Sequence, residues 1–203
     1  MKHTLLIATV MGVTLIACNN QSATPLTKDE STTQPSKLEG AALIKRGEYM
    51  VSVSGCHDCH SPKTLTPQGP KVDSGRILSG HPAQAPLPPI SADDIKPGGW
   101  IYMAPSVTAF AGPWGISYAA NLTPDSATGI GAWTEEVFVK ALKTGKHLGM
   151  ENGRPILPPM PWEGIAQMTD EDLSAMYHYL QSLPAIPNRV PAPTPPNEIA
   201  AKK

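Results

Sequence analysis

Residues 56–60 read C-H-D-C-H, directly after an apolar helical pattern that ends near Gly55. Two thiols three residues apart on a tight turn can reach the two vinyl groups of one porphyrin and form a thioether bond with each. The histidine that follows then projects over the face of the ring, where an imidazole nitrogen can bind the iron. The motif therefore predicts one haem c, attached covalently through Cys56 and Cys59, with His60 as an iron ligand.

The surroundings of the motif weigh against two other uses of a C-x-x-C pair. A thioredoxin-type redox pair would follow a strand in a βαβ pattern, whereas a helical pattern precedes this one. A structural zinc site would need a second pair of ligands, but His81, His147 and His178 are isolated in the sequence. We expect the second ring nitrogen of His60 to donate to a backbone carbonyl, and His57 to face solvent.

Three segments have the apolar spacing of an amphipathic helix: 39–54, 134–144 and 169–183. Thr134 and Thr169 are suited to cap the second and third of these helices, because acidic residues follow each threonine and complement the helix dipole. Gly145 and Pro184 are the expected stops. The pattern predicts an all-α framework.

The rest of the folded part is rich in proline, of which the chain has 23, and poor in aromatic residues, which make up only 5%. Such a composition predicts short helices joined by extended loops, with an apolar cofactor adding to a lean core. Residues 61–120 form a long insertion rich in Pro and Gly. We expect it to be ordered, as loops and short strands, because its aromatic residues need burial. Gly98-Gly99 and Gly112-Pro113 are predicted turns.

The N-terminus has the pattern of an export signal. An apolar run from Leu5 to Ile16 is too short to span a bilayer, which takes about 20 residues. The run ends in L-I-A-C and is followed by polar residues, which resembles the lipobox of bacterial lipoproteins. We therefore predict a lipoprotein signal peptide over 1–17 and lipidation of Cys18. An ordinary cleaved signal with an incidental cysteine is the alternative.

The lipid would hold the chain at the periplasmic face of a bacterial membrane. Asn19 is not the aspartate that retains lipoproteins at the inner membrane, which favours the outer membrane. Residues 18–37 are predicted to be a flexible tether, 38–183 the folded domain, and 184–203 a proline-rich tail beyond it. With 16 basic and 17 acidic residues the chain has a net charge of −1 and lacks the basic stripe that nucleic-acid binding demands.

The chain resembles class I cytochromes c in several places. G-E-Y at 47–49 is similar to their N-terminal helix, whose small residue contacts the C-terminal helix, and T-D-E-D-L-S-A-M-Y-H-Y-L-Q-S-L-P at 169–184 is similar to that C-terminal helix. N-L-T-P-D-S-A-T-G-I-G-A-W-T-E-E at 121–136 and L-P-P-M-P-W at 157–162 resemble the cytochrome subunits and haem domains of bacterial periplasmic dehydrogenases. The resemblance implies a cytochrome c fold of three to five short helices around one haem, interrupted by the insertion, and places Tyr179 and Leu180 at the helix crossing.

In the resembled family a methionine sulfur, carried by a loop shortly before the last helix, is the sixth iron ligand. Met160 occupies that place, and the prolines on both sides hold its backbone extended. A thioether ligand favours iron(II) and so raises the reduction potential. Met150, a histidine or an open site are the alternatives. Trp133 and Trp162 pack either against the haem or in the ordinary core.

A haem closed on both sides has no open iron position, so the resemblance implies an electron carrier rather than an enzyme. It would shuttle single electrons between periplasmic or membrane redox protein partners, alone or as the haem subunit of a dehydrogenase or oxidase complex. The alternative is a haem enzyme or small-ligand sensor with an open distal site, with His81 or His147 at hand. Lys140, Lys143 and Lys146 form either a docking surface for an acidic partner or a solvated helix face.

Overall fold

The computed structural model describes residues 38–201. The predicted signal peptide (1–17), the lipidation site Cys18 and the tether (18–37) lie outside the described residues and stay predictions. Among the helices of the described part, none has the length and apolar character needed to cross a bilayer.

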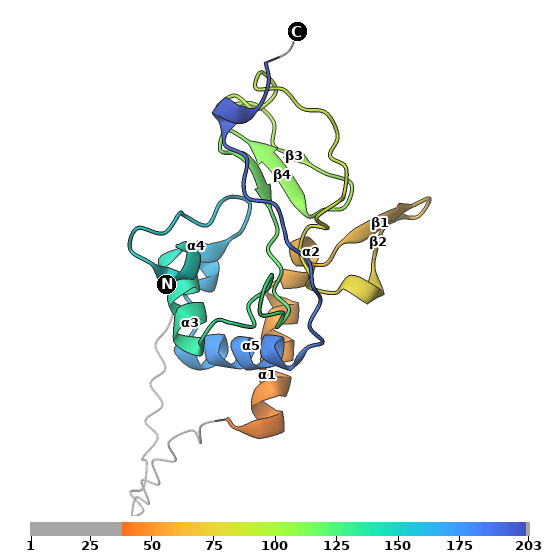
Figure 1. Ribbon diagram of the computed structural model, residues 1–203. Coiled ribbons are helices and arrows are strands. Elements are labelled where there is room, and N and C mark those ends of the chain that lie inside the picture. Colours follow the sequence, from red (N-terminus) through yellow and green to blue (C-terminus); the bar gives the residue numbers. More distant parts are fainter. Residues whose placement is uncertain (1–37, 202–203) are drawn as a thin grey trace, which may run out of the picture. The chain divides into compact units, whose positions relative to one another are not determined.

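The described part is mostly helical (Figure 1). The three long helices lie within one residue of the predicted bounds at each end: α1 (Gly40–Val53), α3 (Glu135–Thr144) and α5 (Asp170–Ser182). Two short helices are added to them: α2 (Cys56–His60) and α4 (Trp162–Ile165). Because α2 consists of the C-H-D-C-H motif itself, the predicted tight turn is one turn of helix.

The predicted helix caps are confirmed. The hydroxyl of Thr134 accepts a hydrogen bond from the Val137 N–H at 3.2 Å, and that of Thr169 accepts from the Asp172 N–H at 3.1 Å. Gly145 ends α3 in the left-handed region, with φ 65°. These contacts satisfy N–H and C=O groups that the ends of a helix leave unpaired. Residues next to the helices therefore determine where α3 and α5 begin and where α3 ends.

Helices α1 and α5 cross in contact, as the resemblance to class I cytochromes c implies (Figure 1). The crossing is closest at Gly47, where an added β-carbon would lie 1.9 Å from the backbone oxygen of Ala175 and 2.7 Å from Cβ of Tyr179. Beside it, Arg46 Nε donates to Asp172 Oδ1 at 2.8 Å. The hydrogen bond from Arg46 lowers the pKa of the Asp172 carboxyl and so keeps it charged.

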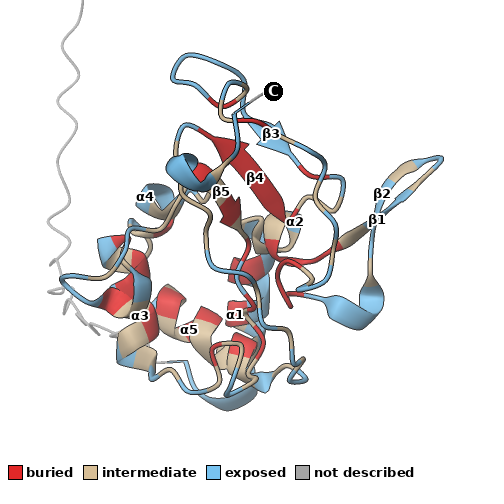
Figure 2. Ribbon diagram, turned by 45° about the horizontal axis from the view of Figure 1, so that its top comes forward, coloured by how far each residue is buried: buried red, intermediate tan, exposed pale blue. Residues whose placement is uncertain are grey.

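The apolar core lies between the long helices, and Figure 2 shows buried residues on the facing sides of α1, α3 and α5. Leu173 and Leu180 of α5 and Val51 of α1 have 1% or less of their surface exposed. The core also takes in Leu78 and Ile130 from connecting segments and Ile165 from α4. One residue of the insertion, Leu78, is therefore part of the central core rather than of a separate lobe.

The insertion 61–120 is ordered and contains two small antiparallel sheets, as expected of short strands. The first pairs β1 (Lys63–Thr66) with β2 (Gly69–Val72); the second has the order β3 (Tyr102–Met103), β4 (Ala109–Gly112), β5 (Gly115–Tyr118). Gly112 pairs with Gly115 across the predicted turn at Gly112-Pro113. The all-α prediction is thus right for the helical framework and incomplete for the insertion.

The aromatic residues of the insertion were expected to be buried, but only some of them are. Phe110 on β4 is 8% exposed, whereas Trp100 is 80% exposed and begins a run of exposed apolar residues that continues to Met103. The buried residues of this sheet are mostly small, such as Ala109 and Ala111. Small side chains therefore pack much of it, and this part of the prediction was wrong.

The segment after α5 also differs from the expectation that the folded part ends at Leu183. It runs back along the insertion (Figure 1), where Thr194 exchanges backbone hydrogen bonds with Ile116 at 2.8 and 2.9 Å. Further on, the N–H of Ala92 donates to the carbonyl of Ala200 at 3.0 Å. Proline removes helical periodicity without preventing such pairing, so the sequence pattern did not distinguish a docked segment from a free one.

We expect Gly47→Ala to destabilise the fold, because the added methyl group overlaps the backbone of α5 and forces the two helices apart. The expected loss in the free energy of unfolding is about 1–3 kcal/mol, measured by urea denaturation. Gly164→Ala is the control, since no atom lies within 4 Å of its β-carbon position in α4. Equal stability of the two variants would contradict the close crossing.

Candidate haem-binding site

The site is built on the junction between α1 and α2. Gly55 takes a left-handed conformation, with φ 69°, that turns the chain from the end of α1 into α2. Cys56 and Cys59 then stand three residues apart on α2, which places them on neighbouring positions of the helix surface. Both are unpaired thiols and both are partly buried. Two thiols on one side of a short helix are the arrangement needed to attach one porphyrin.

The two thiols lack the electrostatics of a redox pair. Burial raises the pKa of the Cys56 thiol to about 11 and also raises that of Cys59. A disulfide-exchanging C-x-x-C needs a lowered pKa instead. Within residues 38–201 no three His, Cys, Asp or Glu side chains converge as a structural zinc site would require.

His60 is 8% exposed, and its ring is held in one orientation. The ring nitrogen Nδ1 lies 2.8 Å from the carbonyl oxygen of Ala120, which confirms the predicted bond to a backbone carbonyl. Because a carbonyl can only accept, Nδ1 carries the proton. Burial lowers the pKa of His60 and keeps the ring neutral, so Nε2 retains a lone pair. That tautomer is the one an iron ligand needs.

Residues of the insertion hold the carbonyl that orients His60, and sequence reasoning did not find them. The N–H of Gly80 donates to the His60 carbonyl at 2.8 Å, and that of His81 donates to the Ala119 carbonyl at 2.9 Å. A β-carbon on Gly80, whose φ is 77°, would lie 2.5 Å from the Ala119 oxygen. A glycine in a proline-rich loop was the one available signal of this close approach.

Two further side chains secure the motif helix. The ammonium of Lys63 donates to the carbonyls of His57, Asp58 and Ser61 at 3.0, 2.5 and 2.9 Å, and so caps the C-terminal end of α2. His57 is partly buried, with Nδ1 3.1 Å from the Ser61 hydroxyl. The expectation that His57 faces solvent was therefore wrong in part, since a neighbouring polar side chain satisfies its ring.

The two candidate methionines lie in different environments. Met160 is partly buried and packs against the central core, whereas Met150 is 53% exposed in a turn after α3. The N–H of Trp162 donates to the Met160 carbonyl at 2.9 Å, which closes a tight turn between the flanking prolines and α4. The loop thus presents Met160 toward the apolar interior, while Met150 points away from it.

Trp133 comes just before the N-cap of α3, and Trp162 is the first residue of α4. Trp133 packs against the core, and its ring lies edge-on to His147 with the centroids 5.8 Å apart. The Trp162 ring covers Gly145, where an added β-carbon would be 2.5 Å from ring atoms. Each tryptophan therefore has protein contacts of its own, and a role against the haem stays a prediction.

The two histidines considered for an open distal site, His81 and His147, contact other side chains, as does His178. His81 is 2% exposed, with Nδ1 2.9 Å from the Thr108 hydroxyl, and His178 pairs with Glu135 at 3.1 Å. His147 is exposed, and its ring lies edge-on to that of Trp133. Because the three rings contact different elements, they do not assemble into one acid–base group.

The basic run on α3 is largely engaged within the chain. Lys143 donates to the carbonyl of Met168 at 2.6 Å and pairs with Asp170 at 3.0 Å, and Lys146 donates to the carbonyl of Glu151. Ammonium groups held in this way are less available to an acidic partner, so these contacts weigh against a docking surface and favour the alternative of a solvated helix face.

These residues fit a covalently bound haem. The two partly buried cysteines are unpaired, His60 is neutral with Nδ1 committed and Nε2 left as the acceptor, and Cys56 and Met160 both pack against the apolar core. A porphyrin needs an apolar surrounding, two thiols and a fixed imidazole, and this part of the chain supplies all three.

Comparison with known proteins points to the same cofactor. No family model matches the chain. The gluconate 2-dehydrogenase cytochrome c subunit of Pantoea cypripedii is 32% identical over 138 residues, which are 68% of this chain and 22% of that protein. The cytochrome c subunit of the alcohol dehydrogenase (quinone) of Gluconobacter oxydans is 33% identical over 138 residues, 68% of this chain and 21% of that protein. The fructose dehydrogenase cytochrome subunit of Gluconobacter japonicus is 28% identical over 139 residues, 68% of this chain and 21% of that protein.

The extent of these matches bears on the insertion. A stretch of 138 residues in a chain of 203 starts at residue 66 at the latest and ends at residue 138 at the earliest, so the match extends over 66–120, most of the insertion. The chain spans about a fifth of the length of the gluconate and alcohol dehydrogenase subunits. It is a distant homologue of the cytochrome c subunits of bacterial dehydrogenases, and its matched part is a c-type cytochrome domain.

Proposed function

We propose that the chain is a monohaem c-type cytochrome that transfers single electrons between redox proteins. The observation that carries the proposal is the buried His60 ring, with Nδ1 donating to the Ala120 carbonyl at 2.8 Å in a helix that also bears Cys56 and Cys59. When bound, haem c supplies an iron that cycles between the iron(II) and iron(III) states. The fixed ring lets this happen with little rearrangement of the protein.

Met160 is the proposed second axial ligand. Its partial burial against the core and the tight turns on either side of it support this role over Met150, which is 53% exposed. A thioether and an imidazole on opposite sides leave no open iron position, so the chain would act as an electron carrier and not as an enzyme. The thioether also favours iron(II).

The proposed partners are redox proteins. The relatives are named as the cytochrome subunits of gluconate, alcohol and fructose dehydrogenases. By analogy, a dehydrogenase would donate electrons to this chain and a second redox protein would accept them. Because the chain spans only about a fifth of those relatives, its own donor and acceptor are part of the proposal.

The proposed location is the periplasmic face of a bacterial membrane, with a lipid on Cys18 as the anchor. The lipobox-like L-I-A-C after an apolar run supports this, and Asn19 favours the outer membrane. Several acyl chains would anchor stably, because each buried methylene group contributes about 0.8 kcal/mol. A tether over 18–37 would let the domain move between partners while it stays near the membrane.

Met160→Ala is expected to abolish the red-region absorption band of methionine-bound iron(III) and to lower the midpoint potential, because iron(II) loses its thioether ligand. Met150→Ala, which removes an exposed methionine, is the matched control and should leave both unchanged. Absorption spectra and potentiometric titration of the purified protein measure the two quantities. Rapid binding of carbon monoxide to the unmutated reduced protein would contradict a closed iron and favour the open-site alternative.

Covalent attachment is tested at the cysteines. Cys56→Ser and Cys59→Ser should each leave one thioether bond, seen as a shift of the pyridine haemochrome band, and the double variant should release its haem to acidified acetone. Cys18→Ser should leave the haem attached. Retention of the haem by the double variant under these conditions would rule out attachment through the motif.

Lipidation is tested at Cys18 in the same host. Cys18→Ser should move the protein from the detergent phase to the aqueous phase in Triton X-114 partitioning, because the acyl chains are no longer added. Cys56→Ser serves as the control and should stay in the detergent phase. An unmutated protein found in the aqueous phase would favour an ordinary cleaved signal.

A further inference from the structure

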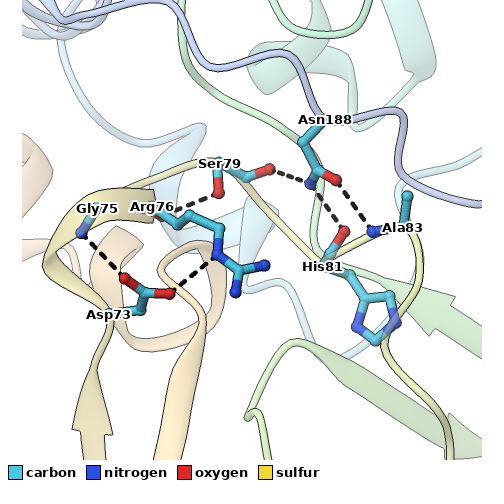
Figure 3. Close-up of polar contacts among 7 residues, drawn as sticks. All are labelled: Asp73, Gly75, Arg76, Ser79, His81, Ala83 and Asn188. Atoms are coloured by element: carbon cyan, nitrogen blue, oxygen red, sulfur yellow. Dashed lines mark hydrogen bonds and ion pairs between the residues drawn. The ribbon is translucent and has the colours of Figure 1, made fainter.

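The segment after α5 carries one side chain that is bonded to three backbone groups of the insertion (Figure 3). Asn188 donates from Nδ2 to the carbonyls of Ser79 and His81 at 2.7 and 2.9 Å, and its Oδ1 accepts from the N–H of Ala83 at 3.0 Å. Both amide hydrogens and the carbonyl oxygen of one side chain are therefore used to hold a single stretch of backbone, 79–83.

That stretch is bonded to the haem-binding residues. Within it, the N–H of Gly80 donates to the carbonyl of His60 at 2.8 Å. The next N–H, that of His81, donates to the carbonyl of Ala119 at 2.9 Å. Asn188 thus binds the carbonyls on either side of Gly80, and the stretch it holds contacts His60 and the residue before Ala120.

The backbone of this stretch packs closely against the Ala119–Ala120 peptide. A β-carbon on Gly80 would lie 2.5 Å from both the Ala119 oxygen and the carbonyl carbon of Ala120. The Ala120 oxygen in turn accepts from Nδ1 of His60. A shift of the backbone at Gly80 would therefore move the acceptor that sets the orientation of the His60 ring.

The other end of the stretch is anchored independently. The backbone N–H and the hydroxyl of Ser79 both donate to the carbonyl of Arg76, at 3.2 and 2.9 Å. Asp73 receives the Arg76 guanidinium at 2.9 Å and the N–H of Gly75 at 3.0 Å, on the far side of the turn from Asn188 (Figure 3). At the end after Gly80, Asn188 adds to the bonds that His81 makes with the Ala119 carbonyl and the Thr108 hydroxyl.

We propose that Asn188 is a positioning residue for the axial histidine: by holding 79–83 against Ala119–Ala120 it keeps the His60 ring bonded to the Ala120 carbonyl. The inference rests on the proposed haem ligation by His60. A hydrogen bond from Nδ1 makes the imidazole a stronger electron donor, which stabilises iron(III). Asn188 thereby lowers the midpoint potential of the haem and narrows the range of orientations of the His60 ring, although it does not contact His60 itself.

The test compares Asn188→Leu, which keeps the side-chain volume without its hydrogen bonds, with Asn188→Ala. Both should bind haem, show a midpoint potential shifted to more positive values, and give broader electron paramagnetic resonance signals from the oxidised haem. Asn197→Leu, an exposed asparagine of the same terminal segment, is the control and should show neither change. A role in stability alone would lower the urea midpoint of the Asn188 variants but leave potential and line shape unchanged, which would overturn the proposal.

If both Asn188 variants fail to fold, a variant that removes only one of the three hydrogen bonds tests the proposal. Ala83 is the second residue of a turn closed by the Ala85 N–H and the Pro82 carbonyl at 2.9 Å, a position that suits proline. Ala83→Pro removes only the N–H that Oδ1 accepts, so a smaller positive shift is expected and an unchanged potential would overturn the proposal. Absence of covalent haem from the unmutated protein would instead overturn the proposed function, so the two failures are distinguishable.

Discussion

The hydrogen bond between His60 Nδ1 and the Ala120 carbonyl is the interaction on which the site depends. It joins His60, the last residue of α2, to Ala120 at the end of the insertion, 60 residues later. It also selects the tautomer in which Nε2 can bind a metal. The motif helix follows α1 directly through the left-handed turn at Gly55. Since α1 is fixed against α5 at Gly47, the helix crossing sets where the imidazole lies and the insertion sets how it is turned.

This division explains why the insertion belongs to the haem domain. Leu78 joins the central core, and its N–H donates to the Ser61 hydroxyl at 3.0 Å, directly after the motif. Lys63, at the start of β1, caps α2 from the other side. The segment after α5 then closes over the insertion through Thr194 and Asn188. The motif is thus held by side-chain and backbone contacts with the insertion, and the insertion is held in turn by the segment after α5. Such polar contacts suit a protein whose aromatic residues make up only 5%.

What sequence could predict follows from the range of the forces involved. Helices α1, α3 and α5 depend on the local spacing of apolar residues, and α3 and α5 also on the caps Thr134 and Thr169. Their bounds were therefore predicted within one residue. The C-H-D-C-H motif and the carbonyl acceptor of His60 were likewise foreseen, because the chemistry of a haem ligand requires them. The identity of that acceptor, Ala120, was not, since the bond spans 60 residues and any carbonyl would serve. Asn188 was missed for the same reason: its partners are backbone atoms, which leave no trace in the sequence.

Rigidity on both sides of the proposed iron site argues for electron transfer over ligand chemistry. On one side the imidazole is braced by a chain of backbone contacts that resists reorientation. On the other, the loop that carries Met160 is stiffened by prolines and turns tightly into α4, so its side chain has little freedom to swing away. An enzyme or sensor needs at least one side that opens and a polar group poised beside it, yet His81 is hydrogen-bonded to Thr108 and the ring of His147 packs against Trp133. Rigidity on both sides lowers the reorganisation that accompanies a change of oxidation state, which is the property an electron carrier requires.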